Sequence, residues 1–507
     1  MAERAGEQTA IVDYDQKKEY SYTDLKVRSR KVAQFLIEKV KVCPGDRVAL
    51  CARNGPWSLE LFYAMPIIGA ILTTYNCLLR EQELLDSVIF EAPKVIFYEE
   101  CYYEKVQVFQ KALPETTLVT LDGNVCPGGW TYNDLLMMTE WDGPWADLTL
   151  RDICMLLHTG GTTGAPKAAK ISYRAMILNT IGQIIDYSIG ETDIVYVSFP
   201  FFHTAAWNAA LPVLLCGGKI YLKRKFDPEG TLRMVEEEKL TTLAGSPSIF
   251  RRLCHCADFN STSFSSVKRI RCGSATPTID LIKKYWEKGS WILFYNGYGM
   301  TESGSGILSL PASTMTRELA HQKAGSVGKP MIFVQVRIVD EEGKDLPVGC
   351  EGELLVQSGN MFSGYWKKPE ASRKAIQDGW LHTGDIARCD EDGFYYICGR
   401  KKNMYISGGE NIYPTEIETF LLNHPAVADA YVFGVPDDDW GEVGKAIVVI
   451  QPDMTLTRAE LSGYLSQNLS SIKRPKYIQF VNEVPRNEAG KIIGNTIDQL
   501  YRFPGEE

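Results

Sequence analysis

Short apolar runs separated by helical patterns fill the first 300 residues of the chain. The runs at 47–51, 93–98 and 153–157 have the length and composition of buried strands. After Thr23, apolar side chains instead recur at helical spacing, with charged residues on the other faces. Strands that alternate with helices of this length predict parallel sheets covered on both faces.

The stretch at 61–72 is the most apolar part of the chain. It contains Pro66 and is too short to cross a bilayer as a helix, so we expect a buried core helix. The first eight residues lack the apolar centre of a signal peptide. No transmembrane segment is therefore expected.

The same alternation continues through the middle of the chain, where a further apolar helix is expected at 207–215. Two of the strands around it end in small residues, which let a ligand approach the backbone at the carboxyl edge of a sheet. The strands are expected at 194–198, 219–222, 241–245, 269–273 and 291–295.

The pattern changes twice in the last third of the chain. Residues 334–356 form a hairpin-like segment with Gly-containing turns, which predicts a β-rich subdomain. Beyond a basic segment at 399–403, strands and helices alternate in a compact unit. We therefore expect an α/β protein: a large N-terminal domain (1–400) of parallel-type sheets with a β-rich subdomain, and a small α+β C-terminal domain (401–507).

Composition narrows the functional class. A length of 507 residues suggests more than one domain, and a formal net charge of −9 argues against a nucleic-acid binder with a broad basic face. Thirteen scattered cysteines fit the reduced thiols of a cytoplasmic protein. Cys254-His255-Cys256 is spaced too tightly for a common zinc site. The sequence leaves the oligomeric state open and is compatible with a homodimer.

A glycine-rich loop at 159–167 follows the strand at 153–157. Its backbone N–H groups, its threonine hydroxyls and a terminal lysine could hold phosphate oxygens, although it is not a Walker A loop. A plain surface turn is the alternative interpretation. The candidate phosphate-binding residues are Thr159, Gly160, Gly161, Thr162, Thr163, Gly164 and Lys167.

This loop resembles the signature loop of the adenylate-forming superfamily, which includes acyl-CoA synthetases, luciferase and peptide-synthetase adenylation domains. Four further stretches match the family in order along the chain, and acyl-CoA synthetases are the nearest group. The departures are Gly160 in place of the usual serine, Ala168 in place of a glycine and Gly494 in place of an arginine. The resemblance implies a ligase that uses ATP, Mg²⁺ and coenzyme A.

The resemblance also assigns roles around the nucleotide. Thr301 would contact the α-phosphate, and Glu302 would hold Mg²⁺, because a hard cation prefers carboxylate and phosphate oxygens. Asp385 would accept both ribose hydroxyls, with Arg400 beside it. The other residues expected around the nucleotide are Gly273, Ser274, Ala275, Asn296, Gly297, Tyr298 and Gly299.

The family pattern makes the C-terminal domain a mobile lid. Lys402 occupies the hinge position, and the Gly408-Gly409 turn would approach the pantetheine thiol in a second conformation. Trp440 would stack the CoA adenine or pack in the core. Lys491 would stabilise the charge that grows when a carboxylate attacks the α-phosphorus, and it is the strongest catalytic candidate.

The segment 201–207 resembles the family segment in which a histidine or an aromatic side chain lines the acyl pocket. His203 is assigned to the pocket and to catalysis, with a core histidine as the alternative. Small side chains nearby and the absence of an obvious basic partner predict a monocarboxylate, with medium to long fatty acids ahead of aryl acids. The expected pocket residues are His203, Ala206, Trp207, Gly245, Gly297 and Gly304.

Two other functions remain open from the sequence. The acyl group could pass to a carrier protein or another acceptor instead of CoA. A catalytically silent nucleotide-binding regulator is the second alternative, and the presence of both Lys167 and Lys491 argues against it.

Overall fold

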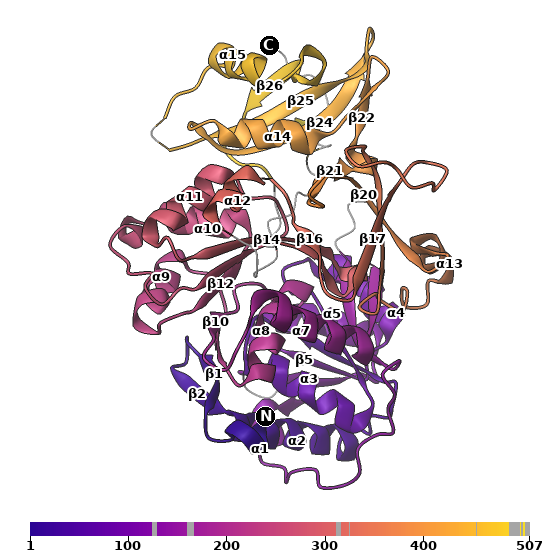
Figure 1. The fold of residues 1–507 in the computed structure, drawn as a ribbon. Helices are drawn as coiled ribbons and strands as arrows, with labels where there is room; N and C mark the ends of the chain where they lie inside the picture. Colours follow the sequence, from indigo (N-terminus) through magenta and orange to yellow (C-terminus); the bar gives the residue numbers. More distant parts are fainter. Residues whose placement is uncertain are drawn as a thin grey trace.

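Four β-sheets organise the protein (Figure 1). The computed structural model describes residues 1–123, 129–159, 167–310, 316–323, 325–452, 454–485, 497 and 500–501. Two large α/β sheets form the N-terminal body. A five-stranded β-subdomain and a five-stranded C-terminal sheet follow.

The first large sheet has seven strands in the order β7-β6-β5-β3-β4-β8-β9, and all neighbours are parallel except β8 and β9. The helices that belong to it are α2 (Tyr22–Glu38), α3 (Pro56–Ile68), α4 (Glu81–Glu91), α5 (Tyr103–Ala112) and α6 (Tyr132–Leu136). The strands are β3 (Arg47–Cys51), β4 (Ile71–Thr74), β5 (Val95–Tyr98), β6 (Thr117–Thr120), β7 (Trp130–Thr131), β8 (Ile153–Thr159) and β9 (Lys167–Ser172).

The second large sheet has nine strands in the order β16-β15-β14-β13-β12-β10-β11-β1-β2. Its strands are β1 (Thr9–Asp13), β2 (Lys18–Ser21), β10 (Ile194–Tyr196), β11 (Lys219–Leu222), β12 (Thr242–Gly245), β13 (Arg269–Cys272), β14 (Leu293–Met300), β15 (Ser305–Ser309) and β16 (Lys329–Pro330). The helices along this part of the chain are α7 (Tyr173–Tyr187), α8 (Thr204–Cys216), α9 (Pro228–Glu237), α10 (Pro247–Cys254), α11 (Ile279–Lys288) and α12 (Arg317–Gln322), with α1 (Ala2–Ala5) at the start.

The β-subdomain pairs its strands in the order β17-β18-β20-β19, and β21 also pairs with β20, on the edge away from β18. The C-terminal sheet has the order β23-β22-β25-β24, with β26 beside β25. The elements are β17 (Val334–Val339), β18 (Gly352–Ser358), α13 (Pro369–Ala375), β19 (Ile376–Gln377), β20 (Trp380–Cys389), β21 (Tyr395–Arg400), β22 (Tyr405–Ser407), β23 (Glu410–Ile412), α14 (Pro414–Asn423), β24 (Val427–Asp437), β25 (Gly441–Ile450), α15 (Arg458–Asn468) and β26 (Tyr477–Phe480).

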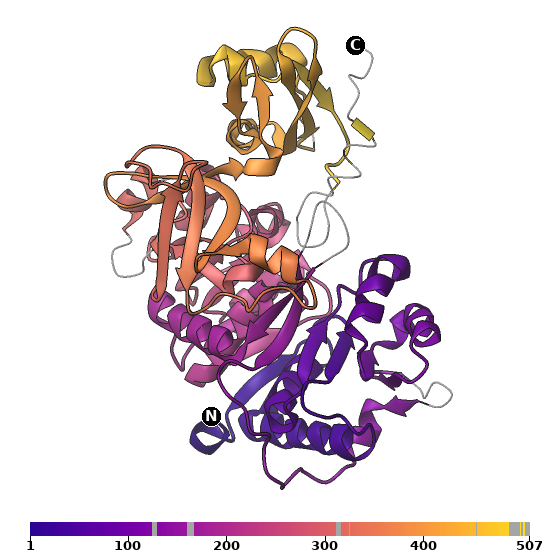
Figure 2. The same ribbon diagram turned by 90° about the vertical axis from the view of Figure 1, so that its right-hand side faces the viewer.

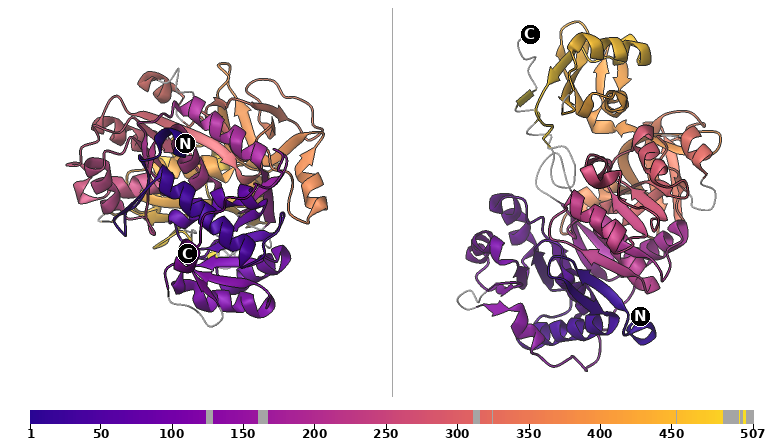
Figure 3. Two further views of the ribbon diagram at one scale, coloured as in Figure 1. Left: turned by 90° about the horizontal axis from the view of Figure 1, so that it is seen from below. Right: turned by 90° about the vertical axis from the view of Figure 1, so that its left-hand side faces the viewer.

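The C-terminal unit has its own hydrophobic core. Ile417 and Leu421 of α14 pack with Leu461 and Leu465 of α15 against the sheet, apart from the cores of the large sheets. Figure 2 and the right-hand view of Figure 3 show this unit at the opposite end of the molecule from the N-terminus. The α/β class with a β-rich subdomain and a C-terminal α+β unit is confirmed.

Three boundaries differ from the sequence prediction. Helix α2 starts at Tyr22, because Ser21 caps it together with Asp24. The apolar stretch at 61–72 is not one helix: α3 ends at Ile68, Gly69 turns the chain with a φ of 80°, and β4 follows. Strand β14 continues through the predicted nucleotide motif to Met300, because it pairs with β15 there.

The described ranges contain no helix with the length and apolar character needed to cross a membrane.

Candidate active site

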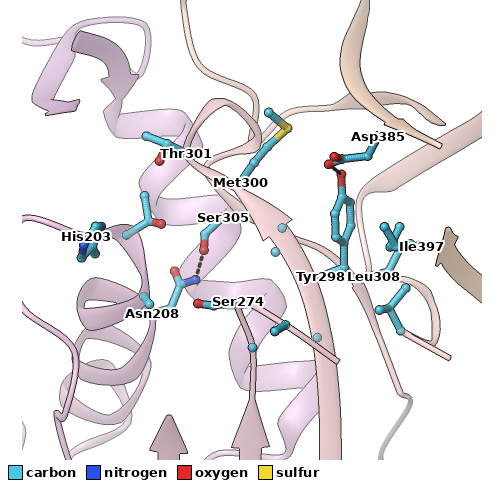
Figure 4. Close-up of a pocket in the computed structure, with 18 of the residues that line it drawn as sticks. His203, Asn208, Ser274, Tyr298, Met300, Thr301, Ser305, Leu308, Asp385 and Ile397 are labelled. Carbon is cyan, nitrogen blue, oxygen red and sulfur yellow. Dashed lines mark hydrogen bonds between the residues drawn. The ribbon is translucent and has the colours of Figure 1, made fainter. Parts of the chain in front are cut away.

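A cavity of about 600 Å³ lies where the second large sheet, the β-subdomain and the C-terminal unit meet. Helices α7 and α8 and strands β13, β14 and β15 form one part of its wall, and β20, β21 and α14 form another. Figure 4 shows His203, Asn208 and Ser305 to the left of this cavity and Tyr298 and Asp385 to the right. The cavity therefore has two chemically different halves.

A buried carboxylate is the centre of the half formed by β14, β20 and β21, which is called the nucleotide half. Asp385 on β20 is 3% exposed, and Tyr298 donates its phenolic O–H to Asp385 Oδ2 at 2.5 Å. Arg400 lies directly opposite on β21, and its Nε is 2.9 Å from Asp385 Oδ1. Burial raises the pKa of Asp385, although Arg400 and Tyr298 act in the opposite direction. This cluster presents a fixed carboxylate beside a cation, which suits recognition of paired hydroxyl donors.

The predicted hinge residue Lys402 also lines this cavity. It follows β21 in the short turn Lys401–Asn403. Burial lowers the pKa of Lys402, as do the charges of Arg400 and Lys167, and Asp385 opposes them. Its ammonium therefore lies among the same charges that surround the nucleotide half of the cavity.

Glu302 and Lys167 mark the region expected to hold the phosphates. Tyr365 donates its phenolic O–H to Glu302 Oε1 at 2.8 Å, and Lys167 Nζ lies 5.1 Å from the centroid of the Tyr365 ring. Within the part of the chain that the structure describes, no three His, Cys, Asp or Glu side chains are grouped to hold a metal ion. Glu302 presents a carboxylate of the kind that could contribute an oxygen ligand to a divalent cation.

Glycines along β13 and β14 bring the backbone close to the cavity. A Cβ at Gly273 would have its nearest neighbour at 3.8 Å, so the surface beside it is open. A Cβ at Gly299 would overlap the carbonyl oxygen of Ser305 on β15, so this position requires glycine for the pairing of β14 with β15. The predicted cofactor residues that line the cavity are Thr159, Lys167, Gly273, Ser274, Ala275, Asn296, Gly297, Tyr298, Gly299, Thr301, Glu302, Asp385, Arg400 and Lys402.

Helix α8 presents a different face to the cavity than the sequence suggested. Ala205 and Asn208 line the cavity, whereas Ala206 is fully buried on the opposite side. Trp207 is also buried: its indole N–H donates to the carbonyl oxygen of Phe201 at 2.8 Å. Neither Trp207 nor Ala206 lines this cavity, and both side chains pack in the core.

Two glycines expected in the acyl pocket do not line the cavity. A Cβ at Gly245 would contact Ile249 and Phe250, and one at Gly304 would overlap the carbonyl oxygen of Asn360. Neither glycine lines the cavity, whereas His203 and Gly297 do.

The residues expected near the CoA thiol form a separate surface on the C-terminal unit. Gly408 donates its N–H to the carbonyl oxygen of Trp440 at 2.9 Å, in the turn between β22 and β23 that also contains Gly409. Trp440 is 50% exposed, so its ring is not part of the core. Lys491 and residues 160–166 of the phosphate loop lie outside the described residues.

Sequence reasoning missed several cavity residues. Arg271 lies on β13, a short strand that carries two arginines, and no motif marked it as a cavity residue. Gln183 and Tyr187 come from α7, whose apolar repeat gave no sign of a polar face toward a ligand. Tyr365, the partner of Glu302, precedes α13 and carried no motif.

Comparison with known proteins identifies the family. Residues 1–366 match the AMP-binding enzyme family, and residues 416–491 match the AMP-binding enzyme C-terminal domain. Feruloyl-CoA synthase of Amycolatopsis sp is 34% identical over 482 residues, covering 95% of this chain and 94% of that protein. 2-Succinylbenzoate–CoA ligase of Bacillus cytotoxicus is 30% identical over 487 residues, covering 94% of this chain and 95% of that protein.

The structure of ATP-bound MatB from Rhodopseudomonas palustris superposes with a TM-score of 0.88 at 28% identity, covering 98% of this chain and 96% of MatB. The chain therefore belongs to the AMP-binding enzyme family, within its AMP-forming acid–CoA ligases.

Proposed function

We propose that this cavity converts a carboxylic acid, ATP and CoA into an acyl-CoA thioester, AMP and pyrophosphate. One observation carries the proposal: the Tyr298–Asp385–Arg400 cluster lines the same cavity as Lys167 and Glu302. A hydroxyl-binding carboxylate and a phosphate-binding region in one cavity suit a nucleoside triphosphate. The ATP-bound relative supports this assignment.

In the first step, a carboxylate oxygen of the acid attacks the α-phosphorus of ATP. The new bond joins that oxygen to phosphorus, the bond from the α-phosphorus to the bridging oxygen breaks, and pyrophosphate leaves. Two anions approach each other, so positive charge around the phosphates lowers the barrier. Lys167 supplies such charge from β9, and by the family motif Lys491 supplies it from the C-terminal unit. Glu302 would hold Mg²⁺, which supplies further positive charge when bound.

In the second step, the sulfur of CoA attacks the acyl carbonyl of the acyl-AMP. A thioester bond forms, the bond from the acyl carbon to the phosphate oxygen breaks, AMP leaves, and the thiol proton passes to solvent. The turn containing Gly408 and Gly409 is exposed, and a Cβ at Gly409 would meet nothing within 4 Å, which leaves room for the pantetheine arm to approach this surface.

The acid itself is proposed to be compact, aryl or short-chain, and not a long fatty acid. The part of the cavity beside α7, α8 and β15 is proposed to hold the acid and is called the acyl half. It presents polar groups of Gln183, Asn208 and Ser305 where an aliphatic chain would need an apolar tunnel. Trp207 packs in the core and does not gate this half. The named substrates of two relatives, ferulate and 2-succinylbenzoate, agree with a compact acid.

Acid-dependent release of AMP by the purified protein tests the proposal. We expect AMP release that requires ATP, Mg²⁺, an acid and CoA together, with aryl acids ahead of fatty acids of ten or more carbons. Acylation of a carrier protein in place of CoA would contradict the CoA step and leave the adenylation step. ATP binding without pyrophosphate release for any acid would instead indicate a nucleotide-binding regulator.

A further inference from the structure

The acyl half of the cavity contains a guanidinium without an acidic partner. Arg271 on β13 lines the cavity, yet no ion pair among the described residues includes it. Arg269, two residues earlier on the same strand, is paired with Asp193 at 2.8 Å. A cation that lines a partly enclosed site is costly unless an anion or a full set of acceptors compensates it.

The protein satisfies this guanidinium only in part. Its Nη1 donates to the backbone oxygen of Asn208 at 3.2 Å, and its Nη2 donates to Gln183 Oε1. The guanidinium carbon lies 4.1 Å from the centroid of the Tyr187 ring. Its Nε is buried without a hydrogen-bond partner. Burial lowers the pKa of Arg271, as expected for a cation that lacks a counter-charge, but a guanidinium stays charged in proteins.

The acidic residues of the cavity are already occupied elsewhere. Asp385 is paired with Arg400, and Glu302 accepts from Tyr365. Glu418 of α14 accepts from the backbone N–H of Val432. The acyl half, defined by Gln183, Tyr187, His203, Asn208, Arg271 and Ser305, therefore carries a net positive charge with Arg271 as its source.

A network of side chains fixes the groups around Arg271. Asn179 of α7 donates to Asn208 Oδ1 at 2.5 Å, and Asn208 in turn donates to Ser305 Oγ. A Cβ at residue 306 would lie 2.7 Å from the amide nitrogen of Gln183, so Gly306 allows Gln183 to reach Arg271. The guanidinium is thus held in one place by three elements, as a group that selects a ligand should be.

We propose that Arg271 determines acid specificity and that the acid carries a second carboxylate, which binds this guanidinium. The inference rests on the proposed ligase function and names its substrate class as dicarboxylic acids, with an aromatic or short spacer. A carboxylate would supply the missing counter-charge and accept from the planar guanidinium fork. This replaces the monocarboxylate predicted from the sequence, which counted basic residues only near 201–207.

The test compares matched acids with the full-length enzyme. The panel contains 3-phenylpropanoates that carry a ring carboxylate, hydroxyl or methyl group at each ring position, together with hexanedioate and heptanoate. CoA-dependent AMP release gives kcat/KM for each acid. For the preferred ring position we expect the carboxylate to exceed the methyl analogue by about 100-fold or more, because a site built for a polar group rejects an analogue that leaves it unpaired.

Variants assign this preference to Arg271. Arg271→Met should bring the carboxylate-to-methyl ratio to about 1 or below, and Arg271→Lys should retain part of it, because lysine keeps the charge but loses the fork. Arg252→Met, which removes an exposed arginine of α10 outside the cavity, should leave the ratio unchanged. The KM for ATP should stay the same in all three variants, which separates a specificity change from misfolding.

The outcomes separate the two proposals. A wild-type enzyme that prefers methyl or hydroxyl analogues would overturn the dicarboxylate inference and leave the ligase function intact. The dicarboxylate inference would also be overturned if Arg271→Met lowered kcat/KM by the same factor for every acid. Absence of AMP release with every acid would contradict the ligase function and the inference together. If Arg271→Met does not fold, the carboxylate-to-methyl ratio of the wild-type enzyme alone tests the dicarboxylate inference.

Discussion

At the scale of single residues, we predict that the protonation of Asp385 controls the affinity for ATP. Burial raises its pKa, so the folded protein holds this proton more strongly than the unfolded chain does. Ionisation therefore costs stability as pH rises through the window between the ordinary and the raised value. In the proposed ribose role, the ionised carboxylate accepts a hydrogen bond from each of the two hydroxyls. We predict that the KM for ATP rises as the pH falls. The midpoint of this rise should lie at a higher pH than the ordinary pKa of an aspartate.

Asp385→Asn tests the same residue by removing its charge. The KM for ATP should rise about 10- to 100-fold, because hydrogen bonds to a charged acceptor contribute about 1.5–3 kcal/mol. The pH dependence described above should disappear in this variant. Asp392→Asn, an exposed carboxylate in the turn between β20 and β21, is the control and should behave as wild type. An unchanged KM in Asp385→Asn would contradict the ribose role.

The sequence identified residues that belong to motifs but missed residues assembled by folding. Asp385, Arg400 and Tyr298 came from the family pattern, and the structure brings them together. Arg271 and Gln183 are 88 residues apart, so no local pattern shows that they meet. The polarity of the acyl half therefore emerged only from the fold.

At the scale of elements, the strands and helices were largely predictable, but the faces of apolar helices were not. Helix α8 is apolar on nearly every side, so no amphipathic stripe shows which residues meet the core. The family resemblance placed Trp207 in the pocket, and the small side chain of Ala206 was expected beside it, although Ala205 and Asn208 line the cavity. The run at 61–72 has the same difficulty, because periodicity cannot distinguish a buried strand from a buried helix.

The pairing of β14 with β15 depends on Gly299. Gly299→Ala should lower the free energy of unfolding by at least about 2 kcal/mol, because the new methyl group overlaps the Ser305 backbone. Gly273→Ala is the matched control on the same cavity wall: its methyl group meets only ordinary contacts, and stability should change by less than about 1 kcal/mol. Chemical denaturation measures both. Equal stability of the two variants would contradict the tight pairing.

At the scale of the whole molecule, the turn at Lys401–Asn403 joins the β-subdomain to the C-terminal unit, which has its own core. We predict that Lys402 acts both as a cation of the cavity and as the hinge. Lys402→Ala removes the cation, whereas Lys402→Pro also fixes φ near −65°. Lys402→Pro should be slower than Lys402→Ala, and this further loss of rate should be about tenfold larger for thioester formation than for adenylation. Only the second step requires domain rotation.

Separate assays of the two steps measure this difference. Pyrophosphate exchange reports adenylation, and acyl-CoA formation from preformed acyl-AMP reports the second step. An equal additional loss in both assays on going from alanine to proline would contradict the hinge.

The proposed mechanism depends on a cation that the C-terminal unit supplies for the attack on ATP. The most direct test is acid-dependent pyrophosphate exchange by Lys491→Ala, measured beside thioester formation from preformed acyl-AMP. Exchange should fall about 100-fold or more, as for loss of one group that stabilises a transition state, while thioester formation persists. Lys476→Ala, a lysine of the same unit paired with Asp437, should leave both activities intact. Unchanged pyrophosphate exchange in Lys491→Ala would contradict the role of this lysine in the attack on ATP.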